Sequence, residues 1–188
     1  MDKESLFNDV KDLLLSVKWT HKITAVHYDR LSKYNCWLVW SKVIAAFISS
    51  GSVASLLVSA NIWTKSFSIF GSIIFTAIEL VSNKFRLEEN RVNLFNAKEE
   101  LWEISQELTS LDREIKSSSD NAIPIQVERK RYIELLNRVK AIQIRLSPSS
   151  SKDIKVASRD IKKRHDYDNW ENQRILLPPD LWHFREDK

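Results

Sequence analysis

Apolar residues recur every seven positions along the second half of the chain. The longer series consists of Leu87, Leu94, Leu101, Leu108 and Ile115. A second series falls three positions beyond three of these residues, at Ala97, Ile104 and Leu111. Together the two series form one apolar stripe on an α-helix, which is typical of a helix that packs along its whole length. The pattern predicts a long helix over about residues 85–117.

A second helix is predicted after the turn-forming stretch SSSDN at residues 117–121. It begins near Pro124, because proline suits the first turn of a helix. Its apolar positions repeat in the same way, at Ile125, Tyr132, Leu135, Val139, Ile142 and Leu146. Residues 84–147 are therefore predicted to form an antiparallel, coiled-coil-like helical hairpin. The spacing does not say whether the apolar stripe is covered within one chain or between chains.

The two ends of the chain flank this hairpin with shorter elements. Residues 1–36 predict an amphipathic helix that packs on the hairpin through the apolar face of Leu6, Val10, Leu13, Leu14 and Val17. The stretch SPSSS at residues 147–151 is a predicted linker, and a charged helix and tail follow over residues 152–188. In that tail we expect Leu181, Trp182 and Phe184 to dock onto a neighbouring subunit.

Two apolar runs lie between the N-terminal helix and the hairpin. The first, Val43 to Trp63, has no charged residue, and its roughly 31 Å of helix would match the hydrocarbon core of a bilayer. The second covers about residues 66–82 and is interrupted only by Glu79. The short break between them allows only a tight antiparallel turn. Residues 37–83 therefore predict a transmembrane hairpin, with a buried core hairpin of a soluble bundle as the alternative.

The residues that flank the runs fit a membrane. Trp37 and Trp40 precede the first run and Trp63 ends it, as expected of an aromatic belt at both bilayer interfaces. Basic residues are frequent before the first run and after the second, whereas Lys65 stands alone in the turn. By the positive-inside rule both termini face the cytoplasm. The predicted partner is a lipid bilayer.

Small polar residues recur inside both runs. Ser68, Ser72 and Thr76 are four apart in the second run, with Glu79 one turn further on. Such a stripe could line a water-filled pore and end in a ring of acidic groups, which requires a homo-oligomer because two helices enclose no channel. Helix packing and a carboxylate that reaches the interface are the alternatives. In the first run Gly51, Ser55 and Ser59 follow the small-residue spacing of close helix packing.

Composition supports helices and argues against an enzyme. The 188 residues include two glycines and four prolines, and the prolines all follow residue 123. Because sheets need frequent turn residues, the expected fold class is all-α. Two glycines are too few for the glycine-rich loops that bind phosphates, and Cys36 and the four histidines have no spacing typical of a disulfide or metal site. We expect no catalytic residue, no metal and no cofactor.

A mild net charge of +4 leaves an anionic ligand possible. The candidate ligand-binding residues are basic and aromatic side chains near the C-terminus: Lys162, Lys163, Arg164, Tyr167 and Trp170. Such a cluster could hold a phosphate by charge and stack a base on an aromatic ring. The alternative is a solvated helix face beside packed aromatic residues.

The order of these segments resembles the SLATT family of prokaryotic two-transmembrane effector domains. The resemblance rests on AVHYDRLSKYNCWLVWSKV before the first span, LEENRVNLFNAKEELWEI after the second, and RYIELLNRVKAI in the last helix of the hairpin. It implies an effector of anti-phage defence that oligomerises and opens a pore in the membrane. It also implies control by a nucleotide or oligonucleotide, made or sensed by a separate nucleotidyltransferase or sensor protein.

Three functional hypotheses follow. The first is an oligomeric pore of the cytoplasmic membrane, gated by the cytosolic helices through a nucleotide-type signal. The second is a non-conducting, membrane-anchored coiled-coil scaffold that recruits a partner protein. The third is a soluble helical bundle without membrane function.

Overall fold

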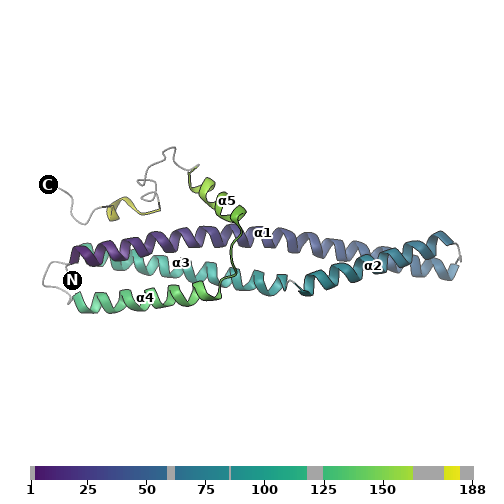
Figure 1. Ribbon diagram of the computed structural model, residues 1–188, viewed down its shortest axis with the longest axis horizontal. Coiled ribbons are helices and arrows are strands. Elements are labelled where there is room, and N and C mark those ends of the chain that lie inside the picture. Colours follow the sequence, from purple (N-terminus) through teal and green to yellow (C-terminus); the bar gives the residue numbers. More distant parts are fainter. Residues whose placement is uncertain (1–2, 59–61, 85, 118–124, 163–175, 183–188) are drawn as a thin grey trace. The chain divides into compact units, whose positions relative to one another are not determined.

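The computed structural model describes residues 3–58, 62–84, 86–117, 125–162 and 176–182. Within these ranges the side chains of residues 49–58, 64–65, 67–68, 82–84 and 162 are not described. The described residues form five α-helices and one short 3-10 helix, with no strand among them (Figure 1). The all-α fold class is confirmed.

Five α-helices and one 3-10 helix follow one another along the described residues. They are α1 (Lys3–Val58), α2 (Ile62–Lys84), α3 (Leu87–Ser117), α4 (Ile125–Arg145), α5 (Ser151–Lys162) and the 3-10 helix η1 (Pro179–Leu181). The N-terminal amphipathic segment and most of the first apolar run are parts of one continuous helix, α1, which has 56 residues.

The chain divides into two compact units. The bundle unit comprises Met1–Tyr28 with Asn93–Lys188, and the hairpin unit comprises Asp29–Val92. Both α1 and α3 contribute residues to each unit, because the divisions fall inside these helices.

The core of the bundle unit is built from the predicted apolar stripes. α1 contributes Leu6, Phe7, Val10, Leu14 and Val17, α3 contributes Ala97, Leu101, Ile104, Leu108, Leu111 and Ile115, and α4 contributes Leu135, Val139 and Ile142. The N-terminal helix therefore packs on the hairpin as predicted. The α3 stripe is covered by helices of the same chain, which settles the alternative that the spacing left open.

Three ion pairs fix the register of α3 against α4. Arg131, Arg138 and Arg145 on α4 pair with Glu114, Glu107 and Glu100 on α3, each at 2.7 Å. Each step of seven residues along α4 matches a step of seven in the opposite direction along α3, so the two helices are antiparallel. Exposed pairs of this kind add little stability, but they disfavour a shifted register.

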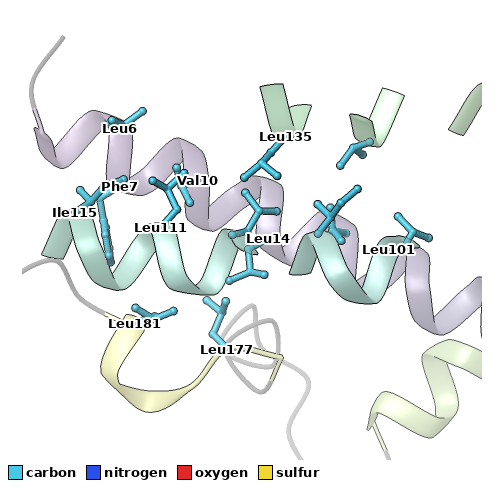
Figure 2. Close-up of a cluster of buried hydrophobic side chains, with 14 of the residues drawn as sticks. Leu6, Phe7, Val10, Leu14, Leu101, Leu111, Ile115, Leu135, Leu177 and Leu181 are labelled. Carbon is cyan, nitrogen blue, oxygen red and sulfur yellow. The ribbon is translucent and has the colours of Figure 1, made fainter. Parts of the chain in front are cut away.

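The segment after α5 completes this core. Leu177 and Leu181 are buried in the same cluster, and Trp182 packs against it. Figure 2 shows Leu177 and Leu181 reaching α3 from the side away from Leu135 of α4. The expectation that Leu181 and Trp182 dock onto a neighbouring subunit is therefore wrong, because their own core takes up these side chains. Phe184 lies outside the described residues.

α5 begins with a reciprocal cap. The Ser150 hydroxyl accepts a hydrogen bond from the Asp153 amide at 3.4 Å, and the Asp153 carboxylate accepts one from the Ser150 amide at 3.0 Å. This arrangement satisfies two backbone donors that a helix start otherwise leaves free. Further along α5, Ala157 and Ile161 are buried.

Candidate functional site

The hairpin unit has large apolar side chains on its outside. Phe47 is 76% exposed, Ile62 is 74% exposed and Phe70 is 66% exposed. The expected belt residues Trp37, Trp40 and Trp63 are also exposed, at 67%, 63% and 71%. A protein surface of this kind marks contact with lipid or with other protein chains.

Small residues occupy the inside of this unit. Among the hairpin-unit residues whose burial the structure describes, the buried ones are Ala45 on α1 and Gly71 on α2. Small residues let two helix backbones approach closely, as in transmembrane packing. Sequence spacing pointed instead to Gly51, Ser55 and Ser59. Ser59 lies outside the described residues, as does the side chain of Ser55, and the structure does not test that prediction.

The structure describes two hydroxyl residues of the predicted polar stripe, Ser72 and Thr76. Both hydroxyls donate hydrogen bonds to backbone carbonyls of α2. The Ser72 hydroxyl donates to the Ile69 carbonyl at 2.9 Å, and the Thr76 hydroxyl donates to the Ser72 carbonyl at 2.9 Å. Such bonds let a hydroxyl lie in an apolar environment without an unsatisfied donor. Both residues are exposed in the single chain. The side chain of Ser68 lies outside the described residues.

The fourth residue of the stripe, Glu79, has a cationic partner across the hairpin. The Lys42 ammonium lies 2.7 Å from the Glu79 carboxylate, and it comes from α1. Lys42 is one of the basic residues that precede the first run, and the sequence analysis did not pair it with Glu79. The available signal was that an antiparallel hairpin brings the start of the first run, next to Lys42, near the end of the second run, where Glu79 lies.

Within the part of the chain that the structure describes, no helix combines the length and the apolar character needed to cross a membrane. Of the predicted first span, residues 59–61 and the side chains of 49–58 lie outside that part. In α2 the side chains of residues 64–65, 67–68 and 82–84 also lie outside it.

The bundle unit contains a cavity of about 400 Å³ between three of its helices and the C-terminal segment. Its lining combines basic, aromatic and apolar residues with one carboxylate: Lys18, His21, Lys22, Ala25, Trp102, Ser105, Asp160, Ile161 and Leu176. The basic residues lie within about one turn of each other on α1, and Trp102 and Ser105 lie one turn apart on α3. Neither group is conspicuous in the sequence, because tertiary packing brings them together.

Contacts among the cavity residues hold their side chains in place. The Lys18 ammonium donates to the Leu176 carbonyl at 2.5 Å. The rings of His21 and Trp102 are tilted against each other with centroids 5.8 Å apart. The Lys22 ammonium lies 3.8 Å from the Asp160 carboxylate, a long ion pair with both side chains partly exposed.

Burial and neighbouring charges both act on the basic groups of the cavity. Burial, and then the charge of Arg113, lower the pKa of Lys18. Burial also lowers the pKa of His21, with Lys98 and Lys22 acting in the same direction and Glu99 opposing them. Neighbouring cations lower a basic group's pKa because they disfavour another positive charge. An anion in the cavity would relieve this repulsion.

The predicted ligand residues lie beyond what the structure describes. Lys163, Arg164, Tyr167 and Trp170 are outside the described residues, and so is the side chain of Lys162. Two described residues close to this stretch in the sequence, Ile161 before it and Leu176 after it, line the cavity. Among the described residues no group of three His, Cys, Asp or Glu side chains could hold a metal ion.

A protein-family model described as SMODS and SLOG-associating 2TM effector domain family 4 matches residues 6–171. The chain belongs to this family. The match includes residues of both units and covers most of the chain, which confirms the resemblance to the SLATT family. No curated protein and no solved structure matches the chain.

Membership in the SLATT family implies an effector with two transmembrane helices in a defence system. The family name links the chain to nucleotide-associated defence systems, and its members are not known as enzymes. In this SLATT protein the hairpin unit contains the two helices of the predicted membrane region, and the bundle unit contains the basic cavity.

Proposed function

We propose that this SLATT protein is a membrane effector whose hairpin unit inserts into the inner membrane of a prokaryotic cell and assembles with other copies into an ion-conducting pore. The observation that carries the proposal is the inverted arrangement of the hairpin unit. Its large apolar side chains are exposed and its buried described residues are Ala45 and Gly71. In water this arrangement is unfavourable. Burying a large apolar side chain contributes about 1.5–3 kcal/mol of stability, and an exposed one does not make this contribution.

An oligomer is required because one hairpin encloses no channel. In the proposed pore Ser68, Ser72 and Thr76 face water, and the apolar side chains face lipid or neighbouring subunits. Glu79 lies near the cytoplasmic end of this stripe, where its pair with Lys42 keeps the two opposite charges together. A paired charge is much less costly to place near lipid than an isolated one.

The bundle unit is the proposed cytoplasmic control element. A signal shifts the ratio of closed to open assemblies only if it binds the two states unequally. The family's link to nucleotide-associated systems supports a nucleotide-type signal, made or sensed by a separate protein. We propose that the effector itself acts without catalysis.

The test is dye and ion release from liposomes that contain the purified full-length protein. The double variant Ser72→Leu with Thr76→Leu should abolish release while leaving the oligomer intact on a sizing column. The matched control is Ile73→Leu with Ala77→Leu, which changes the two neighbouring positions of α2 and should release dye like the wild type.

The outcomes separate the hypotheses. Release by the stripe variant at the wild-type rate would remove Ser72 and Thr76 from the pore lining. Stable membrane-bound oligomers that release nothing under any condition would favour the scaffold that recruits a partner. Recovery of the protein in the supernatant after membranes are pelleted without detergent would overturn the membrane role altogether.

A further inference from the structure

We propose that the cavity of the bundle unit is a nucleotide-binding site, with Lys18, Lys22 and His21 facing the phosphate and Trp102 facing the base. The proposal names a site in described residues, distinct from the predicted cluster at Lys162–Trp170. It rests on the proposed function only for the consequence of binding, since binding itself can be measured without any pore.

The basic side of the cavity retains donors for an anion. An ammonium group has three donors, and one donor of Lys18 is used by the Leu176 carbonyl, so two remain. The ion pair of Lys22 with Asp160 is long, at 3.8 Å, and partly exposed, so water or a phosphate oxygen competes with it readily. Burial is the main cause that lowers the pKa of His21, and Lys98 and Lys22 add to it; a negative ligand placed near these cations would be attracted to them.

The aromatic side provides a flat, accessible surface. Trp102 lies on α3, and one face of this helix is buried in the core. The Trp102 side chain is on the exposed part of the helix and is itself 52% exposed. A half-exposed indole at the edge of a basic cavity is suited to stacking a nucleobase, an interaction worth about 1–3 kcal/mol per base in nucleic-acid complexes. Asp160 on α5, which also lines the cavity, can accept a hydrogen bond from a base N–H or a ribose hydroxyl.

The size of the cavity is adequate for such a ligand. Its volume of about 400 Å³ falls within the range of roughly 300–1,000 Å³ that is typical of small-molecule sites. A phosphate alone would leave most of it empty, and a nucleoside alone would bring no anion to Lys18. A ligand that carries both groups fits the lining better than either part alone.

The site is also connected covalently to the hairpin unit. Lys18, His21, Lys22 and Ala25 lie on α1, and this helix continues without a break to Val58. A ligand that contacts these residues therefore acts on the helix that supplies one half of the hairpin. This continuity offers a direct physical route by which binding could alter the oligomer.

The experiment measures binding to the full-length protein in detergent micelles by equilibrium dialysis. The probes are the four ribonucleoside triphosphates, a purine cyclic dinucleotide, inorganic phosphate and adenosine. We expect at least one nucleotide to bind, and inorganic phosphate and adenosine to bind at least tenfold more weakly. Failure of every nucleotide to bind would overturn the site.

Variants assign the binding to the cavity. Lys22→Gln and Trp102→Leu should each weaken nucleotide binding at least tenfold, and Trp102→Phe should restore most of it. The matched controls are Lys140→Gln, an exposed lysine of α4, and Phe95→Leu, an exposed aromatic residue of α3, and both should bind like the wild type. Circular dichroism of each variant shows whether the helices are retained.

The two proposals fail in different ways. Wild-type affinity in both Lys22→Gln and Trp102→Leu would remove the site from this cavity, whatever the liposome assay shows. Nucleotide binding lost in these variants, together with liposomes that never leak, would leave the site in place and refute the pore.

Discussion

Asp112 makes the stability of the bundle unit depend on pH. Its side chain is fully buried on α3, and neither carboxylate oxygen has a hydrogen-bond partner among the described residues. Burial raises its pKa from 3.8 to about 7, Lys11 and Lys116 oppose the shift, and Asp180 adds to it. The two lysines donate instead to the carbonyls of Trp182 and Asp180 in the C-terminal segment.

The sign follows from proton linkage. The folded protein holds the Asp112 proton more tightly than the unfolded chain, so this group's contribution to stability is complete below the unfolded pKa of 3.8 and is lost as the pH rises through about 7. A shift of about 3 units corresponds to about 4 kcal/mol in total. Between pH 5 and pH 8 the expected loss is about 3 kcal/mol.

The perturbation that isolates this effect is Asp112→Asn, which keeps the shape of the side chain and cannot ionise. At pH 8 the variant should be more stable than the wild type, and by pH 5 its advantage should shrink by about 3 kcal/mol. The measurement is urea unfolding of the full-length protein in detergent, followed by circular dichroism at both pH values.

The control is Thr109→Val, which alters a buried residue one turn away without a titrating group. It should change the free energy of unfolding equally at pH 5 and pH 8. If Asp112→Asn and the wild type lose stability in parallel between these pH values, Asp112 is not the titrating group and the reasoning is refuted.

Three further predictions concern the packing of the two units. Gly71→Leu should separate the helices of the hairpin and cost about 1–3 kcal/mol by overpacking, measured by unfolding in micelles, whereas Ala77→Leu at an exposed position of α2 should cost little. Leu181→Ala should cost about 2–5 kcal/mol because it leaves a cavity in the core, and should expose the C-terminal segment to protease. A double-mutant cycle of Lys42→Gln and Glu79→Gln, based on the free energy of unfolding in liposomes, should give a coupling free energy between the two residues. We expect it to exceed the roughly 1 kcal/mol that is typical of exposed ion pairs.

Each of these outcomes has a clear opposite. Equal stability of Gly71→Leu and Ala77→Leu would mean that α1 and α2 do not approach closely at Gly71. Unchanged protease resistance in Leu181→Ala would show that the C-terminal segment is held by its polar contacts instead. A coupling near zero between Lys42 and Glu79 would place both charges in water rather than near the bilayer.

The helices and their apolar faces could be predicted from the sequence, because a helix has a fixed period. The seven-residue spacing from Leu87 to Ile115 located α3 and its buried face. The absence of proline before residue 124 and the scarcity of glycine argued against a sheet. The same period also identified α4 and the apolar face of the N-terminal helix. These features depend on local geometry, which neighbouring residues determine among themselves.

The partners of those faces could not be predicted in the same way. Leu177 and Leu181 return to a core formed mainly by residues many positions earlier, and the sequence suggested a neighbouring subunit instead. The cavity joins Lys18 and His21 with Trp102 and Asp160, which no local pattern connects.

The sequence by itself determined that this chain is helical, which helix faces are apolar, and that two apolar runs stand in a hairpin. Only the tertiary structure decided that the bundle core closes within one chain, that Glu79 pairs with Lys42, and that a basic cavity lies beside Trp102. The physical reason is that periodicity tells which face of a helix avoids water, whereas the choice of what covers that face depends on shape and charge brought together from distant parts of the chain.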